Sequence, residues 1–171
     1  AIFVIIHYDD EGLTISVNVA GNHTTGDMFF GFVDSGERSE TIGQLRDTWP
    51  GSKFIENPTT VCPIVNDIFR IDHQKSAHPF NLQIKGTNFQ INVWKALLNI
   101  PKGCVLSYQD VASYIGHPKA FRAVANAIAI NPVAYLIPCH RVIAKSGKIH
   151  QYRWGSVRKK ALIGWEAARS A

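Results

Sequence analysis

Residues 107–130, SYQDVASYIGHPKAFRAVANAIAI, have the pattern of two helices joined by a short turn. Ser107 is a favourable N-cap residue, and Asp110 stands three positions later, where its carboxylate can complete a capping box. The tight turn Gly116–Pro118 should end the first helix, and a second helix is predicted from about Lys119 to Ile130. Two helices with this spacing are typical of a helix-turn-helix, whose second helix enters a groove of DNA.

The second helix of this pair has two different faces. Its inward side is expected to be apolar, with Phe121, Val124 and Ile128. Its outward side should carry small or polar side chains, namely Arg122, Ala123 and Asn126. Alanine is the best helix former, so an alanine-rich helix by itself indicates no function. In a basic domain, however, we favour the interpretation that small outward side chains let the helix approach a groove closely.

Charge is distributed unevenly along the chain. Residues 1–84 contain five Lys and Arg against eleven Asp and Glu, whereas residues 85–171 contain thirteen against two. A basic surface is common, but this contrast predicts that the second half binds a polyanion, with nucleic acid as the leading candidate. No apolar run reaches the length of a membrane span, and no signal peptide is visible.

The cysteines of the chain are three in number: Cys62, Cys104 and Cys139. They lie far apart and form no C-x-x-C pair, which argues against a zinc site and a disulfide framework and indicates a reducing compartment. The chain starts at Ala1 and its only methionine is Met28, which leaves open that it is a piece of a longer protein.

The first half, residues 1–84, has the pattern of a small α/β unit. Apolar or alternating runs predict strands at Ile2–His7, Leu13–Val19 and Met28–Val33. Helices are expected from an N-cap at Ser39 to about Arg46 and from Thr60 to about Ile71, before a last short strand at Phe80–Ile84. Nothing in this half has the pattern of a catalytic site.

The second half, residues 85–171, is predicted to be mostly helical. Thr87 or Asn88 can cap its first helix, and Ser156 can cap its last. One face of the last helix is expected to carry residues spaced three or four apart, namely Lys159, Leu162, Ile163 and Glu166. A carboxylate on a helix is by default a surface group, but Glu166 on a partly apolar face is a candidate to orient an imidazole.

The imidazole in question is that of His140, in the segment Pro138-Cys139-His140. The apolar residues 133–137 before it are predicted to be a strand or an extended buried segment that delivers one thiol to one place. A thiol is a strong nucleophile only as the thiolate, and a neighbouring imidazole is a common means of generating it. The alternative is that Cys139 is only a small buried hydrophobic residue, as most free cysteines are.

Residues 131–142, NPVAYLIPCHRV, closely resemble the active-site segment of the O6-alkylguanine-DNA alkyltransferases, also called methylated-DNA–protein-cysteine methyltransferases. Further segments occur in the family's order, at Gly86–Trp94, Ile100–Tyr108, Pro118–Val124 and Tyr152–Glu166. The resemblance covers about residues 84–167, and the first half matches only in size and in the order of its elements.

The resemblance implies an α/β (α+β) protein, with a small N-terminal α/β domain, residues 1–84, and a helical domain, residues 85–171, whose winged helix-turn-helix binds DNA and carries the active site. It implies repair by a single-turnover methyltransferase that flips a damaged guanine out of double-stranded DNA and moves its O6-alkyl group irreversibly to cysteine. O4-methylthymine is a further expected substrate. A monomer without cofactor or metal is expected, in the cytoplasm of a bacterium or archaeon or in the nucleus of a eukaryote.

The resemblance also assigns roles to residues of this chain. The implied catalytic group is Cys139 as acceptor, His140 as base through a water, Glu166 to orient His140, Asn131 to brace the segment, and Tyr108 to assist flipping and donate a hydrogen bond to guanine. The implied DNA contacts are Arg122, which fills the gap left by the flipped nucleotide, with Ala123, Asn126, Ser107 and Lys119. The implied pocket residues are Tyr108, Tyr152, Arg153, Trp154 and Pro138.

Other functions fit the sequence less well. Alkyltransferase-like proteins bind the lesion without repairing it, but in them the cysteine is replaced, whereas Cys139 is present. A regulatory DNA-binding protein would need outward side chains suited to reading base edges, and the second helix has few. A Cys-His hydrolase would need an oxyanion-hole segment, which is not evident. His150-Gln151 stands where the family commonly carries a glycine, so the pocket is expected to be narrow for alkyl groups larger than methyl.

Overall fold

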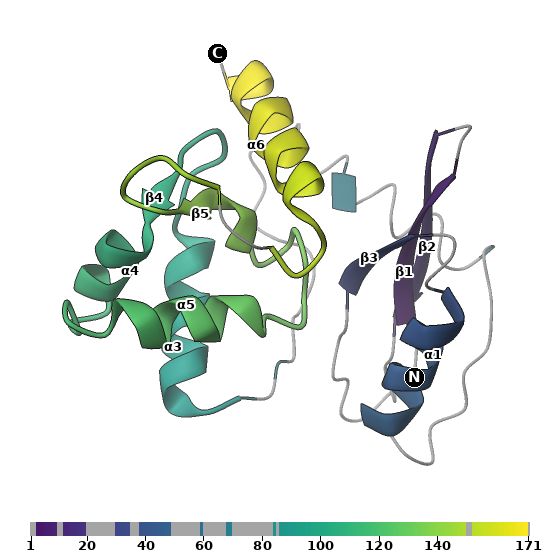
Figure 1. Cartoon of the computed structure of the whole chain (residues 1–171), viewed down its shortest axis with the longest axis horizontal. Coiled ribbons are helices and arrows are strands. Elements are labelled where there is room, and N and C mark those ends of the chain that lie inside the picture. The colour runs from purple at the N-terminus through teal and green to yellow at the C-terminus, as the bar shows by residue number, and fades with distance from the viewer. Residues whose placement is uncertain are drawn as a thin grey trace. The chain divides into compact units, whose positions relative to one another are not determined.

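The computed structural model describes residues 3–9, 12–19, 30–34, 38–48, 59, 68–69, 84, 86–149 and 152–170. The chain divides between Ile84 and Lys85 into two compact units (Figure 1). Within the described residues, no helix combines the length and apolarity that crossing a bilayer requires.

The first unit contains a three-stranded sheet with the order β2-β1-β3. Strands β1 (Phe3–Asp9) and β2 (Gly12–Val19) are antiparallel, and β3 (Phe30–Asp34) pairs in parallel with the other edge of β1. Helix α1 (Arg38–Thr48) follows and contacts β3, with Leu45 buried. All three predicted strands are present, because apolar and alternating runs of this length favour extended backbone.

Three expectations for this unit have other outcomes. Ser39 was predicted to cap a helix, but α1 begins at Arg38, so Ser39 lies inside its first turn. The helix predicted over residues 60–71 lies outside the described residues, apart from Ile68 and Phe69, which are helical. The strand predicted at 80–84 lies outside them as well, apart from Ile84, which belongs to neither a helix nor a strand.

The second unit begins with α3 (Asn88–Leu98), which a capping box starts. Thr87 Oγ1 accepts from the Gln90 backbone at 3.3 Å, and Gln90 Oε1 accepts from the Thr87 backbone at 2.8 Å, so Thr87 is the cap rather than Asn88. Trp94 is buried and donates through Nε1 to the Ala127 carbonyl at 2.9 Å. A Cβ on Gly86 would lie 2.8 Å from the Trp94 ring, so this approach requires glycine.

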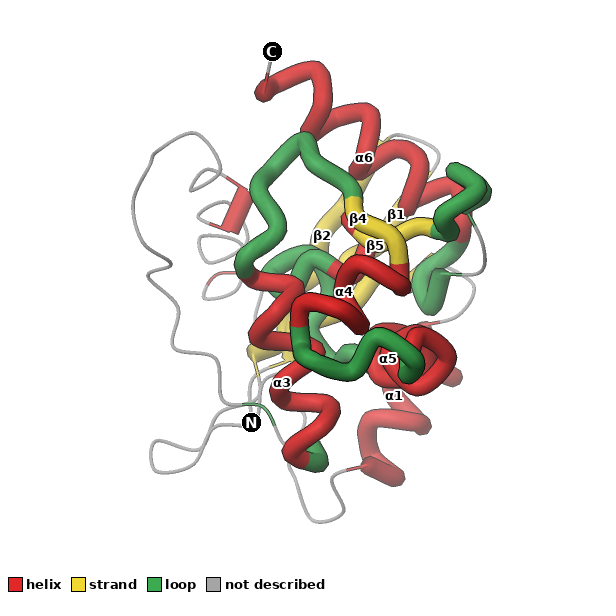
Figure 2. Tube along the Cα trace, turned by 90° about the vertical axis from the view of Figure 1, so that its left-hand side faces the viewer, coloured by secondary structure: helices red, strands yellow, loops and turns green. Residues whose placement is uncertain are grey.

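The predicted helix pair is present as α4 (Tyr108–Tyr114) and α5 (Phe121–Ala129), with the turn between them in green in Figure 2. Ser107 and Asp110 form the expected capping box, with distances of 3.1 and 2.9 Å. Gly116 has a φ of 77°, the left-handed conformation that ends a helix most easily with glycine. The buried contacts of α5 with α3 and α4 come from Val124, Ala127 and Ile128.

Helix α5 begins two residues later than predicted, because the backbone of Ala120 closes a turn onto the His117 carbonyl at 2.8 Å. Phe121 is therefore the first helical residue, and it is 40% exposed instead of packed inward. The guanidinium of Arg122 lies 5.6 Å from the centre of the Phe121 ring. Arg122, Ala123 and Asn126 are exposed, as predicted.

The rest of the unit supports the segment that follows Asn131. Strands β4 (Leu106–Ser107) and β5 (Val142–Ile143) form a small parallel sheet, and the short 3-10 helix η3 (Cys139–Arg141) leads into β5. Helix α6 (Ser156–Ser170) packs against η3. Ser156 was predicted to be the N-cap of the last helix, but it is the first helical residue of α6. A difference of one position is within the usual variation of helix boundaries.

Candidate active site

Asn131 organises the segment that carries the cysteine. Its side chain is fully buried, and Nδ2 lies 2.9 Å from both the Val133 and the Ile137 carbonyl oxygens while Oδ1 accepts from the Val133 backbone at 3.0 Å. These bonds fold residues 133–137 into a compact turn. The predicted strand or extended segment is therefore wrong in its geometry, although its burial is confirmed. Backbone groups that a strand would pair with a neighbour are satisfied here by one amide side chain.

Cys139 opens η3 with only 1% of its surface exposed. Burial raises the pKa of its thiol, while hydrogen bonds from Asn131 and Tyr152 and the charge of Lys159 oppose that rise. Asn131 Nδ2 lies 3.2 Å from Sγ, and the Tyr152 hydroxyl lies 3.8 Å from it. At rest the residue is thus a thiol whose surroundings can stabilise a thiolate once a base removes the proton.

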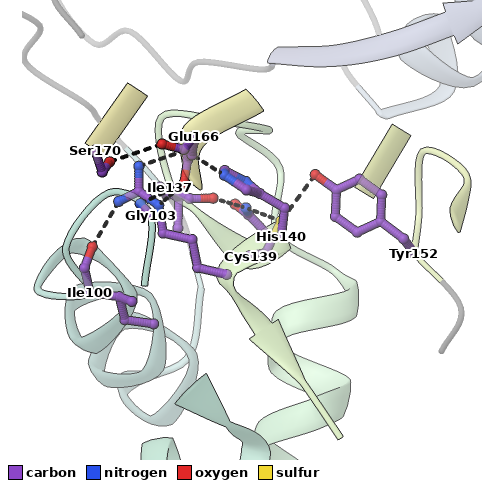
Figure 3. A network of polar contacts seen from close by, with 10 residues as sticks. Ile100, Gly103, Ile137, Cys139, His140, Tyr152, Glu166 and Ser170 are labelled. Carbon is purple, nitrogen blue, oxygen red and sulfur yellow. Dashed lines mark hydrogen bonds and ion pairs between the residues drawn. The ribbon is translucent and has the colours of Figure 1, made fainter. Parts of the chain in front are cut away.

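His140 and Glu166 form a buried pair (Figure 3). His140 Nε2 lies 2.8 Å from Glu166 Oε1, and the two side chains are 0% and 1% exposed. Burial lowers the pKa of His140, although Glu166 raises it, so the imidazole is neutral near pH 7. In that state Nε2 donates its proton to Glu166, and Nδ1 carries a free lone pair. Nδ1 is buried and accepts no hydrogen bond from the described residues.

Arg141 is a member of this site that sequence reasoning did not single out. Its Nε and Nη2 atoms each donate to Glu166 at 2.8 Å, and Nη1 donates to the Ile100 carbonyl at 2.7 Å. Burial alone would raise the pKa of Glu166, but the hydrogen bonds and charges of His140 and Arg141 lower it to about 2. Figure 3 shows Glu166 between the His140 ring and Gly103, whose backbone is 3.4 Å from Oε2. The position of Arg141 directly after His140 was the only available signal.

Lys159 is the second residue whose place in the site was not foreseen. It is 1% exposed, and Nζ donates to the Val142 carbonyl at 2.5 Å. The same ammonium lies 6.0 Å from the centre of the Tyr108 ring and 5.6 Å from that of Tyr152. Burial lowers its pKa, and the negative charge of a Cys139 thiolate opposes this. A signal existed in the sequence, because Lys159 stands two turns before Glu166 on one face of the last helix.

A cavity of about 430 Å³ adjoins the thiol, a volume typical of small-molecule sites. It is lined by residues of the loops and of α4, α5 and α6, namely Tyr108, Ala125, Asn126, Ile128, Ala129, Cys139, Tyr152, Arg153, Trp154 and Lys159. The structure thus brings the acceptor candidate together with the pocket candidates Tyr108, Tyr152, Arg153 and Trp154. Pro138 is buried beside Cys139 but does not line the cavity. His150-Gln151 lies outside the described residues.

One of the candidate DNA contacts, Asn126, lines the cavity. Asn126 belongs both to the exposed face of α5 and to the cavity wall, while Arg122 and Ala123 precede it on α5 and Lys119 is exposed in the turn before the helix. Ser107 is 8% exposed, and its hydroxyl is occupied in the cap of α4. Among the described residues, no group of three His, Cys, Asp or Glu side chains could hold a metal ion.

Residues 88–168 match the family model described as 6-O-methylguanine DNA methyltransferase, DNA binding domain. The inducible methylated-DNA–protein-cysteine methyltransferase of Bacillus subtilis is 36% identical over 146 residues, which cover 82% of each chain. The bifunctional transcriptional activator/DNA repair enzyme Ada of Escherichia coli is 54% identical over 86 residues, and these span 50% of this chain but only 24% of Ada.

Similarity also extends over both units of the chain. The crystal structure of Mycobacterium tuberculosis OGT in complex with DNA matches 98% of this chain and 94% of that one, with a TM-score of 0.63 and 30% identity. This match confirms the predicted fold class, a small α/β unit followed by a mostly helical one. The B. subtilis relative is similar at a level and over a length that define common descent, and we conclude that the chain belongs to the O6-methylguanine-DNA methyltransferase family.

Proposed function

We propose that this chain repairs DNA by moving the methyl group of O6-methylguanine to Cys139, once per molecule. In this proposal residues 85–171 form the DNA-binding and alkyl-acceptor domain, and residues 1–84 form the N-terminal α/β domain. The observation that carries the proposal is the buried Cys139 thiol on the wall of the cavity, followed by a neutral His140 that Glu166 holds at 2.8 Å. A thiol next to a held, neutral imidazole is the arrangement that nucleophilic catalysis requires.

The first step is removal of the thiol proton. His140 Nδ1 accepts it through a bridging water, and the developing imidazolium is stabilised by the ionised Glu166. The thiolate then gains hydrogen bonds from Asn131 and Tyr152 and the nearby charge of Lys159. Together with the hydrogen bond from His140, the two hydrogen bonds from Arg141 keep Glu166 ionised and available for this task.

The second step is alkyl transfer. The sulfur attacks the methyl carbon in line with the C–O6 bond, the S–C bond forms, and the C–O6 bond breaks. Guanine leaves with the electron pair of the C–O6 bond while it accepts a hydrogen bond from the Tyr108 hydroxyl, the proposed donor. Guanine takes up one proton, which balances the proton that the thiol lost to His140, and the imidazole ends neutral. The thioether that remains on Cys139 has no facile reversal, so a molecule that has reacted is spent.

Double-stranded DNA is the proposed partner, with α5 in its groove. A base inside a duplex cannot reach a buried thiol, so the lesion has to leave the stack. Arg122, exposed on α5, would fill the gap, while Lys119, Ala123 and Asn126 approach the backbone. O4-methylthymine is a further proposed substrate. A monomer is expected, located where the DNA is, which for a bacterial or archaeal chain means the cytoplasm.

Intact-mass measurement tests the proposal directly. After incubation with a duplex that contains one O6-methylguanine, the protein should gain the mass of one methyl group, and peptide mapping should place it on Cys139. The reaction should stop at one methyl per molecule when lesions are in excess. An unchanged mass, or a methyl group on another residue, would contradict the proposal.

Arg122→Ala is expected to slow repair of a duplex about 30-fold. The side chain is proposed to offset ~2 kcal/mol of the free energy of base flipping, and adding this amount to the activation barrier lowers the repair rate by that factor. Transfer from a single-stranded oligonucleotide should change much less, since no pairing or stacking has to be broken. Single-turnover rates on the two substrates measure the difference. Lys95→Ala removes the same charge from an exposed site on α3 and should leave both rates nearly unchanged. Equal losses on both substrates would refute the role of Arg122.

A further inference from the structure

Tyr135 has the most unusual backbone conformation of the site. Among the described residues it is the one non-glycine residue with positive φ, at 59°. L-amino acids other than glycine, asparagine and aspartate rarely adopt this left-handed conformation, because Cβ approaches the following carbonyl oxygen. The side chain is nevertheless 6% exposed and well packed. A strained residue that persists beside a reactive group warrants a functional explanation.

The left-handed residue Tyr135 has its ring in an offset stack with the imidazole of His140. The two rings are almost parallel, with 3° between their planes and 5.8 Å between their centres. The Tyr135 ring also meets Trp165 on α6 edge-on, at 6.3 Å and 61°. Trp165 is in turn covered by two cations, with Lys102 Nζ at 4.5 Å and the Arg169 guanidinium at 4.6 Å. A continuous stack thus connects the surface of α6 with the His140 ring.

One hydrogen bond does not fix the orientation of an imidazole. The bond from Nε2 to Glu166 Oε1 defines one point of the His140 ring, but the ring could still rotate about that bond and swing Nδ1 away from its place. A second ring in an offset parallel stack beside it restricts this freedom, since rotation of the imidazole would break the parallel contact. Asn131 stabilises the turn that contains Tyr135, so the stacked ring and the cysteine belong to the same segment.

We propose that Tyr135 is a positioning residue, which holds the plane of the His140 ring and shields its face from water so that Nδ1 is presented as the base for Cys139. This inference rests on the proposed alkyl transfer for its purpose but not for its geometry. The charged groups around the imidazole come from two elements, Arg141 on η3 and Glu166 and Lys159 on α6. None of them is removed by changing Tyr135.

The predicted consequence is a change in how His140 titrates. Burial is the main cause of the lowered pKa of His140. Tyr135→Leu keeps an apolar side chain but admits water to the ring face, so the pKa of His140 should rise toward its ordinary value. The rate of Cys139 alkylation by iodoacetamide near pH 7 should fall roughly tenfold, because the base is both misplaced and partly protonated. Tyr135→Phe retains the stacked ring, so its His140 titration should stay closer to that of the wild type than to that of Tyr135→Leu.

The experiment measures two properties that do not depend on DNA: the pH profile of iodoacetamide alkylation at Cys139 and the His140 ring titration by NMR. A wild-type protein that fails to accept methyl groups would refute the proposed function and leave these readouts intact. Tyr114→Leu makes the same change at an exposed site of α4 and should alter neither property.

Tyr135→Asn provides a second variant, since asparagine tolerates the left-handed backbone and gives a folded protein if leucine does not. An unchanged pH profile and an unchanged His140 titration in either folded variant would overturn the proposal. A Phe variant that resembles the Leu variant instead of the wild type would overturn it as well.

Discussion

Cys139→Ser is expected to abolish alkyl transfer while the affinity for DNA stays the same. A serine hydroxyl at this site has no accessible anionic form near pH 7, and an alcohol is a poor nucleophile toward an alkyl carbon. The transfer rate should fall by roughly 10⁴-fold or more, the scale on which enzymes that lose their nucleophile lose activity. In the proposed complex, DNA binding depends on α5 and on exposed basic side chains such as Arg122 and Lys119, which the substitution leaves unchanged. Intact mass measures transfer, and fluorescence anisotropy with a lesion-containing duplex measures binding.

The matched control is Cys104→Ser, because Cys104 is the other free cysteine of the described residues and is exposed. This variant should accept one methyl group at the wild-type rate. If Cys139→Ser still gained a methyl group, or if Cys104→Ser lost the ability to gain one, the acceptor would have to be reassigned. Loss of DNA binding in Cys139→Ser would mean that the thiol also supports the fold of the segment that Asn131 organises.

Glu166→Gln is expected to have the largest effect on stability. The amide can still accept a hydrogen bond from His140, but it leaves the charge of Arg141, whose side chain is only 13% exposed, without its partner. Removing one member of a buried ion pair lowers the free energy of unfolding by ~3 kcal/mol or more. Transfer should slow as well, because the imidazolium formed in the first step loses its counter-charge. Urea unfolding and single-turnover rates measure the two effects.

The double variant Glu166→Gln/Arg141→Met separates the causes. If the cost of Glu166→Gln comes from the unpaired arginine, the second substitution should recover part of the lost stability but none of the lost transfer rate. If Arg141→Met instead lowered the free energy of unfolding by the same amount in the Glu166→Gln variant as in the wild type, the result would argue against an Arg141–Glu166 ion pair. A stability of Glu166→Gln equal to that of the wild type would contradict the proposed arrangement outright.

The dependence of the free energy of unfolding on acidic pH tests the ionisation of Glu166 independently. The pKa of Glu166 is about 2 in the folded protein against an ordinary value of 4.5, so the unfolded chain binds the proton more readily. Its contribution is therefore fully present above pH 4.5 and is lost as the pH falls toward 2. Glu166→Gln should unfold with a shallower pH dependence in this window, measured by urea titrations at successive pH values. A slope identical to that of the wild type would mean that Glu166 is not held in its ionised form.

Local features of this protein were predictable from local sequence. Ser107 with Asp110, and Thr87 with Gln90, form capping boxes because both partners lie within one turn, where only the backbone conformation has to be right. The adjacency of Cys139 and His140 likewise needs no tertiary structure. The face of the last helix that carries Lys159 and Glu166 follows from the helical period alone.

The errors share a physical origin. The spacing of Phe121 predicts that it packs inward, but α5 starts two residues later, which leaves Phe121 at the helix terminus and 40% exposed. The apolar residues 133–137 suggested extended backbone, yet the hydrogen bonds of Asn131 turn them back on themselves. The first outcome depends on where a helix begins, and the second depends on which backbone groups a polar side chain hydrogen-bonds. The spacing of hydrophobic residues predicts neither.

Short stretches of sequence are sufficient to predict the chain's family, its helix-turn-helix and its candidate nucleophile, because each depends on residues close together along the chain. The protonation state of the site cannot be predicted in this way. Glu166 stays ionised although it is buried, because His140 and Arg141, 26 and 25 positions earlier, hydrogen-bond to it. Removal from water raises the pKa of the Cys139 thiol. Desolvation and the pairing of distant charges exist only once the chain is packed. The sequence alone identifies Cys139 and His140 as the candidate reactive pair, whereas packing shifts the pKa of each and so decides which of the two carries the proton.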